Sequence, residues 1–98
     1  MPAYLIVNYT VDNPDLYSEY QGGAGTALRI GADTELIAFD RDSEVMEGED
    51  IGKQTVVLKF DSVEKAREIY KSGEYQAVVG KRHHATSNHF AVLVDGLV

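Results

Sequence analysis

Short apolar runs of strand character alternate along the chain with longer segments in which apolar residues recur at helical spacing. The runs are rich in β-branched and aromatic residues, and they predict four strands, at residues 3–10, 34–40, 53–60 and 90–94. Helical spacing of apolar residues is found between the first and second runs and again between the third and fourth. The predicted order of elements is therefore β-α-β-β-α-β.

The first predicted helix has a clear start signal. Asn13 is a good N-cap residue, and Pro14 suits the first helical position. Gly31 is expected to end this helix. A glycine weakens a helix by up to ~1 kcal/mol relative to alanine, so we expect a bend or a frayed turn where three of them cluster, at Gly22, Gly23 and Gly25.

The second predicted helix carries its apolar stripe over residues 63–70. Asp61 and Ser62 are expected to cap it. Glu64 follows Asp61 by three residues, which is the spacing of a capping box.

This order of elements is the split βαβ arrangement. It predicts an α+β, ferredoxin-like fold with a four-stranded antiparallel sheet and two helices on one face. A short extra helix is expected over residues 74–79, stopped at Gly80. With 98 residues and no internal repeat, residues 1–98 are expected to form a single domain.

The strands lack the alternation of apolar and polar residues that a sheet with one solvated face would show. Their apolar runs are continuous at residues 4–7, 56–58 and 90–94. The predicted elements include no spare helix to cover the second face. We therefore expect a homodimer that packs sheet to sheet.

Composition narrows the classes of partner. Sixteen acidic residues against nine basic ones give a formal charge of −7, which disfavours binding to nucleic acid or to anionic membranes. The absence of cysteine excludes disulfides and thiol chemistry and fits the reducing cytoplasm, where we expect the protein. No basic leader segment and no apolar run near ~18 residues is present, so neither a signal peptide nor a membrane span is expected.

The clearest concentration of reactive side chains is the sequence Arg82-His83-His84. An arginine offers a bidentate fork to a carboxylate, and a histidine titrates near neutral pH, so together they suit binding a small organic acid and moving a proton. The competing interpretation is a solvated basic turn, or an ion pair between Arg82 and Glu47 or another acid that fixes a loop.

Metal and phosphate sites are not expected, and neither is a cofactor. Adjacent histidines point in different directions, and no HxH or HxxxH spacing exists. The acidic connector at residues 41–52 lacks the glycine and glutamate of a calcium loop, because those positions are Val45 and Ile51. The glycine-rich residues 22–26 lack the lysine of a phosphate loop.

Most of the six tyrosines fall on or beside apolar stripes. Buried tyrosines of this kind are usually core residues whose hydroxyl has a hydrogen-bond partner. Tyr20 and Tyr75 are also placed to line a shared pocket between the helices and the sheet, where Tyr75 would contact a ligand.

Short motifs spread over nearly the whole chain resemble the uncharacterised DUF1330 family. The matching residues are Ala3-Tyr4, Tyr17, Tyr20, Gly31, Glu47-Gly48, Phe60, Ala66, Tyr70, Ser72, Glu74-Tyr75-Gln76, Arg82 and Asp95-Gly96. Two positions depart from the family pattern, because Ala32 replaces the second glycine of a pair and Gly73 replaces a proline. The resemblance implies a dimeric α/β barrel of ferredoxin-like domains and singles out Glu47 in the connector. It implies no particular reaction, because the related superfamily includes monooxygenases, isomerases, haem enzymes and binding modules.

Three functions remain open at this point. The first is cofactor-free isomerase, lyase or oxygenase chemistry on a small acidic or aromatic molecule. Arg82 would then anchor the anion, His83 or His84 would act as acid or base, and Tyr20 and Glu47 would orient or polarise the ligand. The second is a ligand-binding module without chemistry, and the third is a structural or interaction dimer.

Overall fold

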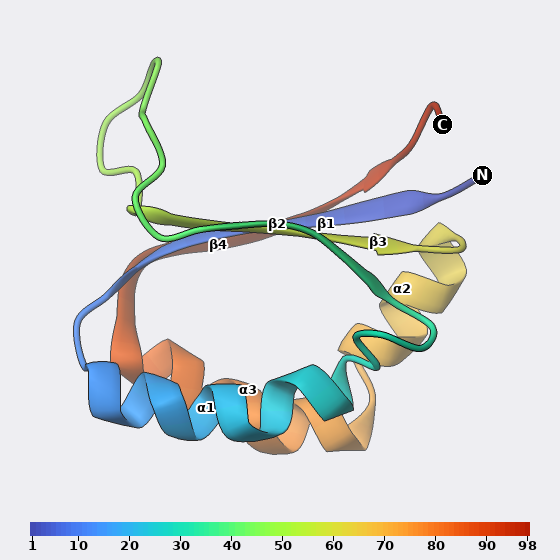
Figure 1. Ribbon diagram of the computed structural model, residues 1–98, viewed down its shortest axis with the longest axis horizontal. Helices are drawn as coiled ribbons and strands as arrows, with labels where there is room; N and C mark the ends of the chain where they lie inside the picture. The colour runs from blue at the N-terminus through green and yellow to red at the C-terminus, as the bar shows by residue number, and fades with distance from the viewer.

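The computed structural model describes all 98 residues, and it contains four strands and three helices (Figure 1). In chain order the elements are β1 (Ala3–Val11), α1 (Pro14–Ala27), β2 (Glu35–Asp40), β3 (Gln54–Phe60), α2 (Val63–Tyr70), α3 (Gly73–Ala85) and β4 (Thr86–Asp95). The predicted β-α-β-β-α-β order is confirmed.

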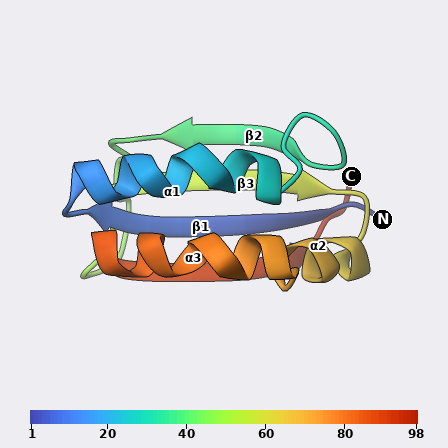
Figure 2. The ribbon, with the colours of Figure 1, turned by 90° about the horizontal axis from the view of Figure 1, so that it is seen from below.

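The strands form one antiparallel sheet in the order β2-β3-β1-β4. All three helices lie on the same face of it, with α1 and α3 side by side and α2 beyond the start of α3 (Figures 1 and 2). This is the ferredoxin-like α+β arrangement expected from the sequence. The opposite face carries no helix.

Helix α1 begins as expected. The Asn13 side chain accepts a hydrogen bond from the Leu16 N–H at 3.1 Å. The expected bend or frayed turn is absent, because α1 runs unbroken through its three glycines. Gly23 has a packing role, since a Cβ there would lie 3.1 Å from Val78 Cγ1 of α3. The helix ends at Ala27, ahead of the expected Gly31.

Of the two residues predicted to cap helix α2, Ser62 does so. The Ser62 hydroxyl oxygen accepts the Lys65 N–H at 3.1 Å, which makes Ser62 the N-cap. Glu64 therefore lies in the first turn and not at the third position from the cap, and the capping box starting at Asp61 is wrong.

The largest correction concerns α3, which extends from Gly73 to Ala85 instead of stopping at Gly80. Ser72 caps it, and its buried face repeats at Tyr75, Val79 and Arg82, so the packing of this face extends the helix through the glycine. The basic residues predicted in a turn therefore lie on its last helical turn. Strand β4 follows directly at Thr86, four residues earlier than the run at 90–94 suggested.

The core lies between the sheet and the helices. Inward positions of β1 and β3 are mostly buried, and most of the outward positions between them are half-buried. The outward Asn8 is buried, because its side chain forms two hydrogen bonds with Gly52 of the connector. On the outer face Ile6 lies between Val57 and Val92 of the neighbouring strands, and Phe90 and Val94 of β4 are exposed. The outer face is therefore apolar as well as uncovered.

None of the three helices combines the length and the apolar character that crossing a membrane would require.

Candidate functional site

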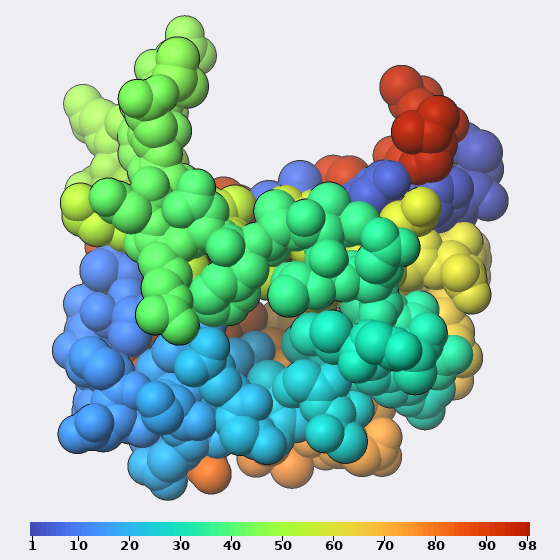
Figure 3. All heavy atoms as spheres, in the orientation of Figure 1, coloured from blue at the N-terminus to red at the C-terminus, as the bar shows by residue number.

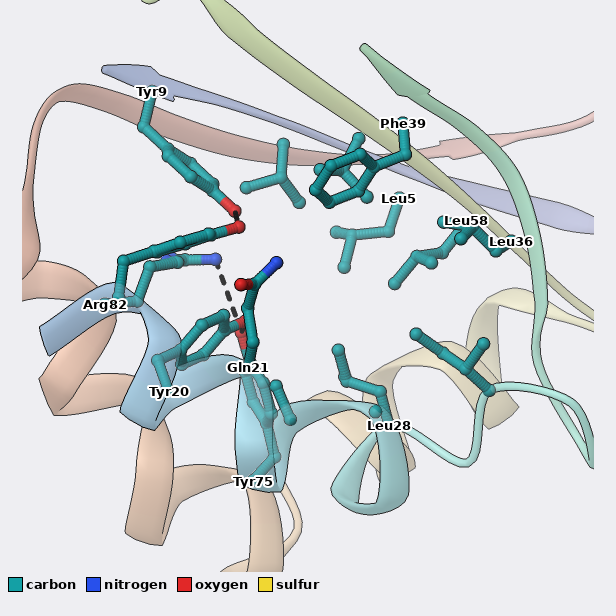
Figure 4. Close-up of a pocket in the computed structure, with 16 residues that line it drawn as sticks. Leu5, Tyr9, Tyr20, Gln21, Leu28, Leu36, Phe39, Leu58, Tyr75 and Arg82 are labelled. Atoms are coloured by element: carbon teal, nitrogen blue, oxygen red, sulfur yellow. Dashed lines mark hydrogen bonds between the residues drawn. The ribbon is translucent and has the colours of Figure 1, made fainter. Parts of the chain in front are cut away.

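A pocket with a volume of about 160 Å³ lies between the inner face of the sheet and helices α1 and α3 (Figure 4). Strands β1, β2 and β3 supply its upper side in the view of Figure 4, and α1 and α3 supply the rest. The lining residues are Leu5, Val7, Tyr9, Tyr17, Tyr20, Gln21, Ala24, Gly25, Leu28, Ile30, Leu36, Phe39, Val56, Leu58, Tyr75 and Arg82. The polar side chains gather at one end of the pocket and the aliphatic ones at the other.

Arg82 is the only charged residue in this lining, and only 3% of its surface is exposed. Its Nη1 donates to the Tyr75 hydroxyl at 3.3 Å, and its guanidinium carbon lies 5.4 Å from the centre of the Tyr9 ring. Its Nη2 lies 3.3 Å from His83 Nε2. The Nε atom of Arg82 is buried and has no hydrogen-bond partner.

No carboxylate neutralises this guanidinium. The salt bridges of the chain join Arg29 to Asp33, Lys53 to Asp42 and Lys65 to Glu68, and none includes Arg82. A buried charge costs several kcal/mol unless it is paired. The alternative expectation of an ion pair between Arg82 and Glu47 or another acid is therefore wrong, and the polar end of the pocket carries an uncompensated positive charge.

Tyrosine hydroxyls surround the same end of the pocket in two hydrogen-bonded pairs. The hydroxyls of Tyr20 and Tyr75 are 2.8 Å apart, and those of Tyr9 and Tyr17 are 2.6 Å apart. The Gln54 side-chain amide donates to the Tyr17 hydroxyl at 2.6 Å. These bonds satisfy the buried phenols and hold them around the guanidinium.

Burial raises the pKa of three of these phenols, Tyr9, Tyr20 and Tyr75. It raises the pKa of Tyr20 to about 12, although the Tyr75 hydroxyl and Arg82 act in the opposite direction. Burial also raises the pKa of Tyr9 and of Tyr75, with Tyr17 adding to the effect at Tyr9 and Tyr20 adding to it at Tyr75. At neutral pH the polar end therefore offers hydroxyl donors and one cation, and no anion.

The six residues singled out from the sequence fall into two groups. Tyr20, Tyr75 and Arg82 come together in the pocket. His83 is exposed and contacts the Arg82 guanidinium from outside the pocket lining, while its ring stacks on His89 at 5.4 Å between centres.

His84 and Glu47 are exposed and belong to no pocket lining. Glu47 lies in the connector between β2 and β3, which projects away from the helices (Figure 1). The catalytic and ligand-binding roles of the six residues remain predictions.

The pKa of His83 is lowered, first by partial burial and then by the positive charge of Arg82, with His89 and His84 adding to it. Because its Nε2 faces a permanent donor, the neutral ring accepts at this nitrogen. No group of three or more metal-ligating side chains converges on a common point anywhere in the chain.

Sequence reasoning missed Tyr9, Gln54 and Gln21 as pocket or network residues. Tyr9 and Gln54 face each other across β1 and β3 at inward positions. A glutamine at an inward position of an otherwise apolar strand was the available signal, because a buried amide needs polar partners.

Comparison with known proteins gives a family and a fold. Residues 2–97 match the sequence profile described as Domain of unknown function (DUF1330). No curated protein matches the chain.

Solved structures with the same fold are distant in sequence. A protein of unknown function from Rhodopseudomonas palustris is 14% identical, with a TM-score of 0.76 over 99% of this chain and 83% of that one. A protein from Thermobifida fusca, described as dimeric, ferredoxin-like and of unknown function, is 17% identical, with a TM-score of 0.67 over 98% of this chain and 92% of that one.

SnoaB from Streptomyces nogalater, described as a cofactor-independent oxygenase, is 8% identical, with a TM-score of 0.65 over 99% of this chain and 94% of that one. At these identities the likeness establishes the ferredoxin-like fold alone.

Proposed function

The chain belongs to the DUF1330 family, and for this member we propose that the pocket binds a small organic anion with an apolar body. The observation that carries this proposal is the buried guanidinium of Arg82, which has an unpartnered Nε and no carboxylate near it. A carboxylate accepts two parallel hydrogen bonds from a guanidinium, so a carboxylic acid is the ligand class that fits.

The remainder of the pocket supports the same class. Next to the guanidinium, one hydroxyl of the Tyr20–Tyr75 pair donates to the other, and the remaining hydroxyl hydrogen is free to donate to an anion. The rest of the lining is mostly aliphatic or aromatic, which suits a hydrocarbon body. A cavity of about 160 Å³ is close to the size that holds one benzene ring, so the body inside it is about that large.

The binding protein is proposed to be a homodimer that packs through the outer face of the sheet. That face exposes Phe90, Val92 and Val94 without a covering helix. The connector and the C-terminal end rise on this side at opposite ends and leave a trough above the sheet (Figures 1 and 3). A second copy of the chain, related by a twofold axis, would bury these residues against their own equivalents.

Benzoate and benzamide form a matched pair of probes for the anion site, because they differ in charge and hardly in shape. Calorimetric or NMR titration is expected to show benzoate binding to the wild type at least about tenfold more tightly than benzamide. Arg82→Met is expected to remove that preference. Lys81→Met, which removes a charge from an exposed residue of the same helix, is expected to keep it. Equal binding of the two probes, or no binding of either, would contradict the proposal.

A second candidate function is proton transfer within the same site. It is supported by the contact between His83 Nε2 and Arg82 Nη2, because a ligand carboxylate that takes over the guanidinium would free this nitrogen of the neutral imidazole to act as a base. His83 would then take a proton from the carbon next to the carbonyl of a keto acid, and Arg82 would stabilise the resulting enolate. Phenylpyruvate in D₂O would exchange its methylene protons faster than in buffer alone, and His83→Ala would return the rate to that of the buffer. Unchanged exchange in His83→Ala would exclude this assignment.

A further inference from the structure

The pocket has a buried polar end and an exposed apolar end. At the polar end, Arg82 and the paired tyrosines are almost completely buried. At the other end, Ile30, Leu36 and Phe39 line the pocket although 36%, 44% and 39% of their surfaces are exposed. In space-filling view the surface is hollowed between α1 and β2 (Figure 3). The mouth of the pocket is therefore apolar and its interior is charged.

A small number of polar groups in an otherwise apolar pocket fixes the orientation of a ligand. A ligand that reaches Arg82 must pass the apolar mouth with its anionic group in front. Whatever part of the ligand exceeds the cavity of about 160 Å³ then remains at the mouth, against Ile30, Leu36 and Phe39.

We propose that the ligand is an amphiphilic carboxylic acid, either a fatty acid or an acid with an aryl-alkyl chain, that binds with its head inside and its tail toward the mouth. The inference rests on the proposed function and adds the orientation and the class of tail. The head forms hydrogen bonds with Arg82 and Tyr75. The tail covers Leu36 and Phe39, two large apolar side chains that remain partly exposed although Arg41 lies 5.7 Å from the centre of the Phe39 ring.

A series of straight-chain acids tests the orientation, namely hexanoate, octanoate, decanoate and dodecanoate, each below its micellar concentration. A fully buried methylene contributes roughly a fourfold gain in affinity. At a half-exposed mouth we expect roughly a twofold gain per methylene, continuing through dodecanoate. Affinity that peaks at hexanoate or octanoate and then falls would overturn the proposal, because it indicates a closed pocket.

Substitutions at the mouth locate the tail. Leu36→Thr and Phe39→Thr keep strand propensity, and we expect them to weaken dodecanoate binding more than hexanoate binding, so that the gain in affinity with chain length is flattened. Ile37→Thr is the matched control, since Ile37 is similarly exposed on the same strand and does not line the pocket. Equal effects of all three substitutions would overturn the assignment.

The remaining outcomes separate this inference from the proposed function. If no acid of the series binds, or if Arg82→Met does not weaken hexanoate, the proposed function itself fails. If hexanoate binds through Arg82 and the longer acids gain nothing, only the head-inside orientation fails. Leu36→Thr and Phe39→Thr could instead change the mass measured by light scattering and leave unchanged the dependence of affinity on acid length. In that case a second copy of the chain covers Leu36 and Phe39, and the head-inside orientation is again wrong.

Discussion

In α3, Arg82 donates a hydrogen bond from Nη1 to the hydroxyl of Tyr75, two helical turns earlier, at 3.3 Å. Both side chains are buried, and no carboxylate shares this part of the core. The pocket therefore contains a buried cation without a carboxylate partner, which is an unfavourable environment for a charge. An arrangement that costs stability in the empty protein and suits an anionic ligand is typical of a binding site.

Replacing this arginine with an apolar residue of similar length is expected to separate stability from binding. Arg82→Met removes the buried charge, so we expect the free energy of unfolding to stay unchanged or to rise by up to about 2 kcal/mol. Benzoate binding is lost in the same variant. Urea denaturation and calorimetry measure the two effects. A loss of stability above about 2 kcal/mol would indicate that the guanidinium is structural.

Alkaline pH is expected to destabilise the protein through its buried phenols. The folded-state pKa of Tyr20 is about 12, above the ordinary value of 10.0, so the folded state holds this proton more tightly than the unfolded chain. The stability that this group contributes is complete below pH 10 and is lost as pH rises toward 12, at about 1.4 kcal/mol per pH unit. Tyr9 and Tyr75, whose pKa values are also raised, add to this loss from pH 10 and continue it at higher pH.

Denaturation curves recorded from pH 9 upward, together with the absorbance of tyrosinate, measure this dependence. Tyr20→Phe loses the hydrogen bond to Tyr75 and is expected to be about 1 kcal/mol less stable at neutral pH. Its stability should also fall less steeply between pH 10 and 12. If the stability of Tyr20→Phe fell as steeply with pH as that of the wild type, the pKa of Tyr20 would not be raised in the folded protein.

Two glycines are expected to respond to alanine in opposite directions. A Cβ at Gly52 would lie 2.4 Å from the backbone carbonyl carbon of Tyr9, so Gly52→Ala forces β1 to move and should cost about 2–3 kcal/mol. A Cβ at Gly22 meets open space on a helix, so Gly22→Ala should gain up to about 1 kcal/mol. The midpoints of urea denaturation compare the two variants. If Gly52→Ala left the stability unchanged, the backbones of Gly52 and Tyr9 would not lie this close together.

The order of the strands and helices could be predicted from the sequence, because the spacing of apolar residues differs between strands and helices. The end of α3 could not be predicted from the sequence, because Gly80 indicated that the helix ends there. Tertiary packing of Tyr75, Val79 and Arg82 on one helix face outweighs that local preference. That face is recognised only when Arg82 is counted among the buried residues.

The site was predicted in part for a related reason. Arg82, Tyr20 and Tyr75 were singled out, but whether an arginine is buried depends on contacts between distant segments. Tyr9 and Gln54 meet only through the register of β1 and β3, which the sequence leaves open. The exposed mouth residues of β2 were likewise indistinguishable from core residues.

The titration of His83 is expected to report the charge on Arg82. Its pKa is lowered in the folded protein, so the folded state binds this proton less tightly than the unfolded chain. The stability linked to this group is present above the ordinary pKa of 6.5 and is lost as pH falls through the lowered value. NMR titration should place its midpoint below 6.5. Arg82→Met, or saturation with benzoate, should raise it.

His84 serves as the internal reference for this titration, since it is exposed on the same turn of α3 and has no hydrogen bond to Arg82. At constant pH, the ring NMR signals of His84 should move less than those of His83 when benzoate binds. Equal changes at both histidines would indicate a general effect of charge, and an unchanged His83 would show that the anion does not bind at the guanidinium.

The outer face of the sheet is expected to hold two copies of the chain together. Val92→Lys places a charge beside Ile6 on that face, where the proposed dimer would bury it without a partner of opposite charge. Light scattering at micromolar concentration should give twice the chain mass for the wild type and the chain mass for this variant. Ala77→Lys adds the same charge to an exposed position of α3 and should leave the dimer intact. A wild-type monomer would exclude the proposed dimer, and a dimer that survives Val92→Lys would move its interface to another surface.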